Sequence, residues 1–145
     1  MRLLIINGPN LNFLGIREPE IYGNRDFSAL IALCKQTCAE LGIECETYQS
    51  NHEGDIVDRI QAAYGKVDGI VINPAAYTHT SVAIPDALKA VGIPTVEVHL
   101  SDINSREEFR RHSFVSPVAV KTICGRGFDG YVEAIGYLKE YINKF

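Results

Sequence analysis

The chain has 145 residues, of which 46% are hydrophobic and 22% charged, the size and balance of a single globular domain over 1–145. Its 14 basic and 18 acidic residues give a formal net charge of −4, without the positive excess that binding to nucleic acid or an anionic membrane requires. No apolar run approaches the roughly 20 residues that cross a bilayer, and the N-terminus lacks the apolar length of a signal peptide. We therefore expect neither a nucleic-acid nor a membrane partner, and a cytoplasmic location.

Strand-like and helix-like segments alternate in the first third of the chain. A continuous aliphatic run at 3–6 predicts a strand buried on both faces. Apolar residues at helical spacing then predict a helix over 27–41, with Asp26 as its N-cap and Gly42 as its terminator. A second strand is expected near 43–49.

The same alternation continues to the C-terminus. The next helix is expected to bury one face that contains Ile56, Ile60, Ala63 and Tyr64, and to end at Gly65. The remaining elements, in chain order, are a strand at 69–73, a helix over 81–91, a strand at 94–100, a short charged helix around 105–111, a strand at 118–124 and a closing helix around 131–142.

Strands that alternate with helices across short connections predict a parallel sheet covered by helices on both faces. The fold class is therefore α/β, a flavodoxin-like three-layer sandwich with a five-stranded parallel sheet. One connection, 8–25, is much longer than the usual strand-to-helix loop and carries chemically competent polar residues. We interpret it as a lid over a functional site; a plain surface excursion is the alternative.

The cysteines and the missing motifs narrow the chemistry. The spacing of Cys34, Cys38, Cys45 and Cys124 contains no CxxC pair, which favours free buried thiols in a reducing compartment. His79 and His99 lack partners at metal-ligand spacing, so we expect no metal site. The dinucleotide, triphosphate and α/β-hydrolase signatures are absent from the sequence.

Polar side chains follow three of the predicted strands, at the edge where open parallel sheets bind ligands. They are Asn10 and Asn12, then Asn73, Thr78, His79 and Ser81, then Glu97, His99 and Ser101. Glu97 and His99 are two positions apart on a strand, so their side chains share a face and the carboxylate can orient the imidazole. This pair suits a general acid; a structural histidine satisfied by a neighbouring acid is the alternative.

Two further segments carry possible ligand-binding groups. Tyr22, in the predicted lid, becomes a usable base if a guanidinium favours its phenolate, and Arg17 could supply that charge; a solvated Arg–Tyr pair in a loop is the alternative. After the fourth strand, the chain passes through Leu100 and Ser101 to a helix expected to begin near Asn104 or Ser105, where free backbone N–H groups predict a site for a carboxylate. Arg110 lies in the short charged helix, where an exposed ion pair with Glu107 or Glu108 is the simpler interpretation.

Several segments together resemble one family, the type II 3-dehydroquinate dehydratases. They are Asn-Gly-Pro-Asn-Leu-Asn at 7–12, Leu-Gly-Ile-Arg-Glu-Pro through Tyr-Gly at 14–23, Asn-Pro-Ala-Ala-Tyr-Thr-His-Thr-Ser at 73–81, and Glu-Val-His-Leu-Ser at 97–101 with Arg-Glu-Glu-Phe-Arg at 106–110. The resemblance covers nearly the whole chain. It implies a cofactor-independent lyase of one catalytic domain that converts 3-dehydroquinate to 3-dehydroshikimate, the third step of the shikimate pathway, through an enolate.

The resemblance also implies roles for individual residues. Tyr22 is the expected base, Arg17 keeps it anionic, and Asn10 positions a water on the enolate oxygen. His99, held by Glu97, protonates the departing hydroxyl. The substrate-binding residues implied are Asn73, His79 and Arg110 for the ring hydroxyls, Leu100 and Ser101 for the carboxylate, and Asp86.

Members of this family assemble as homododecamers, tetramers of trimers, in which an aspartate reaches the site of a neighbouring subunit. Asp86 occupies that position, and the Pro85 beside it departs from the family pattern. We expect the helix to tolerate this proline in its first turn, which leaves the subunit contact open. Two functional alternatives remain: a non-catalytic flavodoxin-like module that binds a small carboxylate, and a hydrolase in which His79 or His99 activates Ser81 or Ser101.

Overall fold

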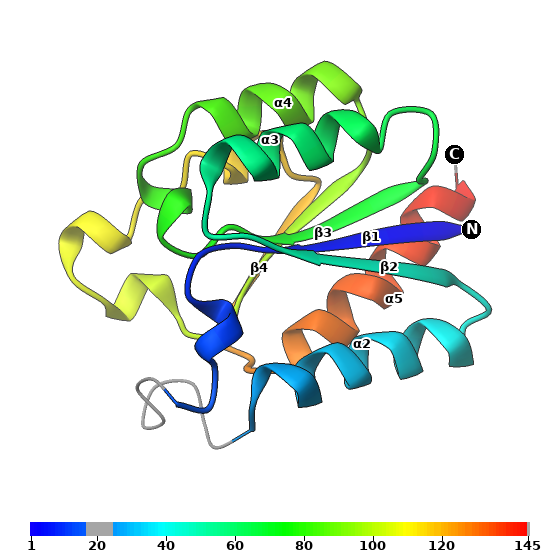
Figure 1. Cartoon of the computed structure of the whole chain (residues 1–145), viewed down its shortest axis with the longest axis horizontal. Helices are drawn as coiled ribbons and strands as arrows, with labels where there is room; N and C mark the ends of the chain where they lie inside the picture. The colour runs from blue at the N-terminus through cyan, green and yellow to red at the C-terminus, as the bar shows by residue number, and fades with distance from the viewer. Residues whose placement is uncertain (17–24, 145) are drawn as a thin grey trace.

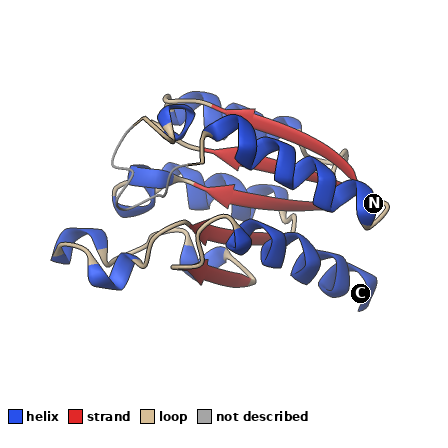
Figure 2. Ribbon diagram, turned by 90° about the horizontal axis from the view of Figure 1, so that it is seen from below, coloured by secondary structure: helices blue, strands red, loops and turns tan. Residues whose placement is uncertain are grey.

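A computed structural model describes residues 1–16 and 25–144. Its centre is a five-stranded parallel sheet with the strand order β2-β1-β3-β4-β5, which confirms the predicted flavodoxin-like arrangement. The strands are β1 (Arg2–Asn7), β2 (Glu44–Gln49), β3 (Gly69–Asn73), β4 (Thr95–His99) and β5 (Lys121–Cys124). Figure 2 shows the five strands side by side, with helices on both sides.

Two helices cover each face of the sheet within the described residues (Figure 1). The helices α2 (Phe27–Glu40) and α5 (Asp129–Lys144) pack on one face, and α3 (Glu53–Ala62) and α4 (Ala83–Val91) on the other. Alternate residues of β1 divide between the two cores, because successive side chains of a strand point to opposite faces: Leu3 and Ile5 join the first core, Leu4 and Ile6 the second. No helix in the described ranges is long and apolar enough to span a membrane.

The helix ends follow the signals in the sequence. Asp26 accepts a hydrogen bond from the backbone N–H of Ala29 at 2.8 Å and caps α2, as predicted. Gly42 and Gly92, both with φ near +70°, follow α2 and α4 in the left-handed conformation that glycine adopts without strain. Pro85 lies in the first turn of α4, and the prediction that the helix tolerates it is confirmed.

Three predictions about local structure were wrong. Tyr64 lies beyond the end of α3 and is 68% exposed, because the chain leaves the helix at Ala63 and turns at Gly65. The charged helix expected around 105–111 is instead two 3-10 turns, η3 (Ile103–Ser105) and η4 (Glu108–Arg110), with an extended residue between them.

The fifth strand also starts later than expected. The segment from Ser116 to Val118 forms a 3-10 turn, η5, and β5 begins only at Lys121. Pro117 in this turn has no N–H to give to a sheet ladder, which favours a turn over a strand. The four cysteines are free, as predicted; Cys34 and Cys38 are buried, and Cys45 and Cys124 are half-buried.

Candidate active site

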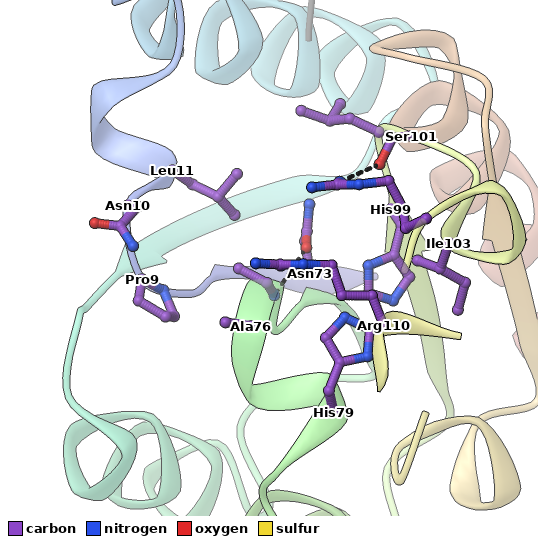
Figure 3. Close-up of a pocket in the computed structure, with 13 residues that line it drawn as sticks. Pro9, Asn10, Leu11, Asn73, Ala76, His79, His99, Ser101, Ile103 and Arg110 are labelled. Carbon is purple, nitrogen blue, oxygen red and sulfur yellow. Dashed lines mark hydrogen bonds between the residues drawn. The ribbon is translucent and has the colours of Figure 1, made fainter. Parts of the chain in front are cut away.

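A pocket lies beyond the carboxyl ends of the central strands, where the sequence predicts a ligand site. It is lined by Pro9, Asn10, Leu11, Asn73, Ala75, Ala76, His79, His99, Leu100, Ser101, Ile103, Arg106 and Arg110. Figure 3 shows the side chains of Asn73, His79, His99 and Arg110 gathered around the same space. The structure thus brings together seven of the predicted site residues: Asn10, Asn73, His79, His99, Leu100, Ser101 and Arg110.

Of the other four predicted site residues, two lie outside the part of the chain that the structure describes, and two are described but do not line this pocket. Arg17 and Tyr22 lie outside the described residues. Glu97 lies behind His99 and reaches the pocket only through it. Asp86 is exposed in the first turn of α4 and is absent from the lining of its own chain's pocket.

Glu97 and His99 form the predicted pair. The Nε2 atom of His99 lies 2.6 Å from Oε2 of Glu97, and both side chains are buried. Val96, Val98 and Leu100 point into the core under α5, as the period of two requires. Because Nε2 is engaged by the carboxylate, Nδ1 is the ring nitrogen left for a ligand.

The charge of Glu97 is fixed by its surroundings. Burial alone would raise the pKa of this carboxyl, but hydrogen bonds from His99, Ser116 and Thr78 outweigh it and lower the pKa to about 2. Glu97 is therefore an anion throughout the neutral range. The carboxylate in contact with the imidazole fixes the orientation of the ring and supplies a counter-charge beside it, an arrangement that suits a general acid.

The ring of His79 is held so that it can accept a hydrogen bond from a ligand. Its Nδ1 donates to the carbonyl oxygen of His112 at 2.8 Å, which leaves Nε2 unprotonated in the neutral ring. Burial lowers the pKa of His79, and the positive charges of His99 and Arg110 act in the same direction. At neutral pH the ring can therefore accept a hydrogen bond from a hydroxyl group in the pocket.

Asn73, at the end of β3, is held in one orientation from both ends of its amide. Its Nδ2 donates to the hydroxyl of Tyr131 at 3.0 Å, and its Oδ1 accepts from the backbone N–H of Ala75 at 3.0 Å. One N–H of the amide remains for a ligand. The local backbone is tight as well: the N–H of Gly8 donates to the Asn73 carbonyl at 2.8 Å, and a side chain at Gly8 would clash with Pro74.

Backbone strain coincides with the pocket. Asn10 and Ala75, with φ of 69° and 54°, are the non-glycine residues with positive φ in the described ranges, and both line the pocket. Asparagine tolerates this conformation, and the N–H of Asn10 is held by Asn51 Oδ1 at 3.0 Å. Alanine does not favour it, so Ala75 stores strain of the kind that is common at binding sites.

The segment after β4 differs from the prediction in detail. Arg106 lines the pocket and donates from Nη1 to Ser101 Oγ at 3.3 Å, a site position that the sequence analysis did not single out. Asp102 Oδ1 takes the N–H of Asn104, so that donor is not free for an anion as the sequence suggested. Arg110 makes the expected ion pair with Glu107 at 2.9 Å and lines the pocket at the same time.

The hydrolase alternative lacks the required contact. Ser81 Oγ accepts the N–H of Ile84 in the first turn of α4 at 3.0 Å, and Ser81 is absent from the described residues that line the pocket. Ser101 is contacted by Arg106, while the two histidine rings bind Glu97 and the His112 carbonyl. In the described residues, no group of three or more His, Cys, Asp or Glu side chains could hold a metal ion.

The fold and the pocket together define a flavodoxin-like α/β protein with a buried carboxylate–imidazole pair at the ligand-binding edge of its sheet. The family model for dehydroquinase class II matches residues 1–139. The chain belongs to the class II dehydroquinase family, which confirms the resemblance seen in the sequence.

Individual relatives support the same family. A 3-dehydroquinate dehydratase of Clostridium acetobutylicum is 56% identical over 144 residues, which cover 99% of this chain and all of the relative. A catabolic 3-dehydroquinase of Verticillium alfalfae is 55% identical over a match that covers 97% of this chain and 94% of the relative. The crystal structure of type II dehydroquinase from Butyrivibrio crossotus superposes with a TM-score of 0.94, 55% identity, and coverage of 96% and 97% of the two chains.

Proposed function

We propose that this chain is a lyase that dehydrates 3-dehydroquinate to 3-dehydroshikimate, with residues 1–145 as one catalytic domain. Membership of the class II dehydroquinase family supports the activity. The single structural observation that carries the proposal is the buried Glu97–His99 pair, 2.6 Å apart, at the edge of a pocket lined by polar groups. An ionised carboxylate behind an imidazole is the arrangement a proton donor needs.

The reaction has two proton transfers. The Tyr22 phenolate, kept anionic by Arg17, removes a proton from the carbon beside the ketone, and the electron pair of that C–H bond forms an enolate. A water held by Asn10 hydrogen-bonds the enolate oxygen. The enolate then re-forms the ketone, and its carbon–carbon electron pair makes a new double bond to the next carbon as the C–O bond on that carbon breaks. The protonated ring of His99 gives its proton to the departing hydroxyl, which leaves as water.

His99 donates that proton from Nδ1, because Glu97 engages Nε2. The ionised Glu97 balances the positive ring before the transfer, when the histidine is charged inside a largely buried site. After the transfer His99 is neutral and Tyr22 carries the proton from carbon, so one proton must return through solvent before the next cycle. A pocket that excludes water makes each well-placed donor worth about 10² to 10³ in rate.

The remaining pocket residues bind the substrate. Asn73 and His79 hold ring hydroxyls, the amide as donor and the neutral imidazole as acceptor. Arg110 binds a further hydroxyl, and the backbone around Leu100 and Ser101 receives the carboxylate. These roles are supported by the position of all five residues in one pocket lining.

The chain acts as a homododecamer, a tetramer of trimers, in which Asp86 completes a neighbouring subunit's site. The exposure of Asp86 and its absence from the lining of its own pocket support this arrangement. Sedimentation at several protein concentrations tests it: a species of about twelve chains supports the assembly, and a monomer at all concentrations contradicts it. The cytoplasmic location stays a prediction.

One experiment tests the activity. Purified protein is mixed with 3-dehydroquinate in the presence of a chelator, and the ultraviolet absorbance of the conjugated enone product is followed, with heat-unfolded protein as the control. We expect absorbance to grow in proportion to the amount of folded protein. A module that only binds small carboxylates would give no absorbance, and that result would reject the lyase.

A further inference from the structure

Hydroxyl groups surround the carboxylate of Glu97 inside the protein. Besides the ring of His99, four lie within hydrogen-bond distance of it, and we call them the hydroxyl cage: Thr78, Ser113, Ser116 and Thr122. They come from η2 (Ala75–His79), from the segment between η4 and β5, and from β5 itself. Three separate parts of the chain therefore converge on one carboxylate.

Two of the cage hydroxyls lie near one carboxylate oxygen of Glu97, and the other two lie near the second oxygen. Thr78 Oγ1 and Ser113 Oγ lie 2.6 Å and 2.7 Å from Oε2, the oxygen that also contacts His99. Ser116 Oγ lies 2.6 Å from Oε1, and Thr122 Oγ1 lies 3.3 Å from the same atom. Distances of 2.6–2.7 Å are typical of hydroxyls that donate to a charged oxygen.

Other contacts fix the direction of these hydrogen bonds. Ser113 Oγ accepts the backbone N–H groups of Val115 and Ser116, each at 3.1 Å, and its own proton faces Glu97 Oε2 at 2.7 Å, closer than Thr78 Oγ1 at 3.4 Å. Ser116 Oγ accepts a hydrogen bond from Thr122 Oγ1 at 3.1 Å and donates its own hydrogen bond to Oε1 of Glu97. The single proton of Thr122 is shared between Ser116 and Oε1, and the three shorter contacts all donate to Glu97, so the cage favours the anion over the neutral acid.

The cage does not touch the pocket. Its four residues are absent from the described residues that line the pocket, and Thr78 and Glu97 are fully buried. Any effect of the cage on catalysis must therefore pass through Glu97 to His99. A hydroxyl here can change proton transfer without changing a contact to the substrate.

We propose that the hydroxyl cage is a set of positioning residues, with Thr78 at its centre, that keeps Glu97 ionised and aimed at His99 so that the protonated ring retains its counter-ion. This inference rests on the proposed acid role of His99. Loss of one hydroxyl removes a hydrogen bond to a charged group and raises the pKa of Glu97 by about one to two pH units. The carboxylate is also held less firmly toward His99, and this loss of position weakens its support of the charged ring even at neutral pH, where Glu97 stays ionised.

Other titratable groups face Glu97 from the elements around it. His99 is on the same strand, His79 is in η2 with Arg110 near it, and Cys124 is on β5. Burial, and next the charge of Glu97, raise the pKa of Cys124, so the thiol stays neutral through the acidic range. His79 titrates on the acid side of its usual value, so kinetics alone would mix its titration with that of Glu97. The ionisation of Glu97 must therefore be observed directly.

The test compares Thr78→Val, which keeps the shape and removes the hydroxyl, with Thr78→Ser, which keeps the hydroxyl and removes the methyl group. Carbon-13 NMR of the labelled Glu97 carboxyl follows its ionisation between pH 3 and pH 6 in the resting protein. We expect Glu97 to stay ionised throughout in the wild type and in Thr78→Ser, and to titrate within this range in Thr78→Val. In turnover assays at neutral pH, where Glu97 is ionised in every variant, Thr78→Val should lower kcat about tenfold because the carboxylate is held less firmly toward His99, with KM within about twofold.

Ser81→Ala is the matched control, because it removes another buried hydroxyl from the same region. This hydroxyl accepts the N–H of Ile84 and makes no hydrogen bond with Glu97. It should lower thermal stability and leave the Glu97 titration and kcat unchanged. The proposal would be overturned if Ser81→Ala shifted the Glu97 titration as much as Thr78→Val, or if Thr78→Ser and Thr78→Val lost the same amount of kcat. Either result would show that altered packing, and not the missing hydroxyl, causes the effect.

A second variant and a measurement without substrate allow the hydroxyl cage to be tested on its own. Should Thr78→Val fail to fold, Ser116→Ala at the partly exposed edge of the cage replaces it, with the same expected titration. The NMR arm needs no substrate, so it tests the cage even if the wild type does not dehydrate 3-dehydroquinate. An unshifted Glu97 titration in a folded variant without the hydroxyl would refute the cage while leaving the lyase proposal intact.

Discussion

The hydroxyl of Tyr131, buried in α5, donates a hydrogen bond to the side-chain oxygen of Asn7 at 2.6 Å, although 124 positions separate them. The same hydroxyl accepts from Nδ2 of Asn73 at 3.0 Å. One phenol thus joins the last helix to the ends of β1 and β3 and orients an amide in the pocket. Burial raises the pKa of Tyr131 above its usual range, so the group stays neutral and acts as donor and acceptor at once.

Tyr131→Phe removes both of these hydrogen bonds and leaves two buried amides unsatisfied. We expect the free energy of unfolding to fall by about 1 to 3 kcal/mol and KM to rise more than kcat falls, because Asn73 loses its orientation. Urea unfolding and steady-state kinetics measure the two effects. Tyr137→Phe, on the same helix with its ring half-buried against Tyr141, is the control and should change stability by less than about 0.5 kcal/mol. Equal effects in the two variants would contradict a specific role for the Tyr131 hydroxyl.

Tyr22→Phe tests the proposed base. Removal of the phenol deletes the group that takes the proton from carbon, so turnover should fall by about 10² to 10⁴, while substrate binding stays measurable by calorimetry. Exchange of deuterium from labelled substrate into water should slow to the same extent, because it reports proton removal alone. Near-normal exchange in the variant would show that another group is the base.

The pH dependence of substrate binding tests His79. Because the pKa of His79 is lowered, its ring is neutral at neutral pH. It gains a proton on Nε2 only when the pH falls below the usual pKa of a histidine. Protonation turns an acceptor into a donor, so KM should rise on the acid side as this pKa is crossed. In His79→Gln the rise should disappear, because an amide does not titrate there. A KM that rises identically in the variant would assign the effect to another group.

Glu97 should make stability depend on pH. Its pKa is lowered from 4.5 to about 2 by folding, so the unfolded chain binds the proton first. The resulting stabilisation, about 3 kcal/mol, is fully present above pH 4.5 and is lost as the pH falls toward 2. Urea unfolding at several pH values measures it, and Glu97→Gln should show a flatter dependence over this range. Equal slopes for the two proteins would show that Glu97 is not the group responsible.

The parts of this protein that depend on local spacing could be predicted from the sequence. The aliphatic runs and helical repeats specify the strands and helices in the right order, and Asp26 marks the start of α2. The period of two on a strand places Glu97 and His99 on one face, which the structure confirms at 2.6 Å. Short motifs in the right order also identified the family, because each motif stays together in the sequence.

Contacts between distant segments were decided only by tertiary packing. Ser113 and Ser116 reach Glu97 from the turn before β5. Pro117 signals a turn in the sequence, but nothing in the sequence says that the hydroxyls of this turn lie against Glu97. Arg106 enters the pocket because two 3-10 turns replace the expected helix. In the sequence pattern alone, Tyr131 is indistinguishable from the other apolar residues on the buried face of α5. Its hydrogen bonds to Asn7 and Asn73 form because α5 packs against the sheet beside the ends of β1 and β3. Spacing along the chain does not encode this proximity in space.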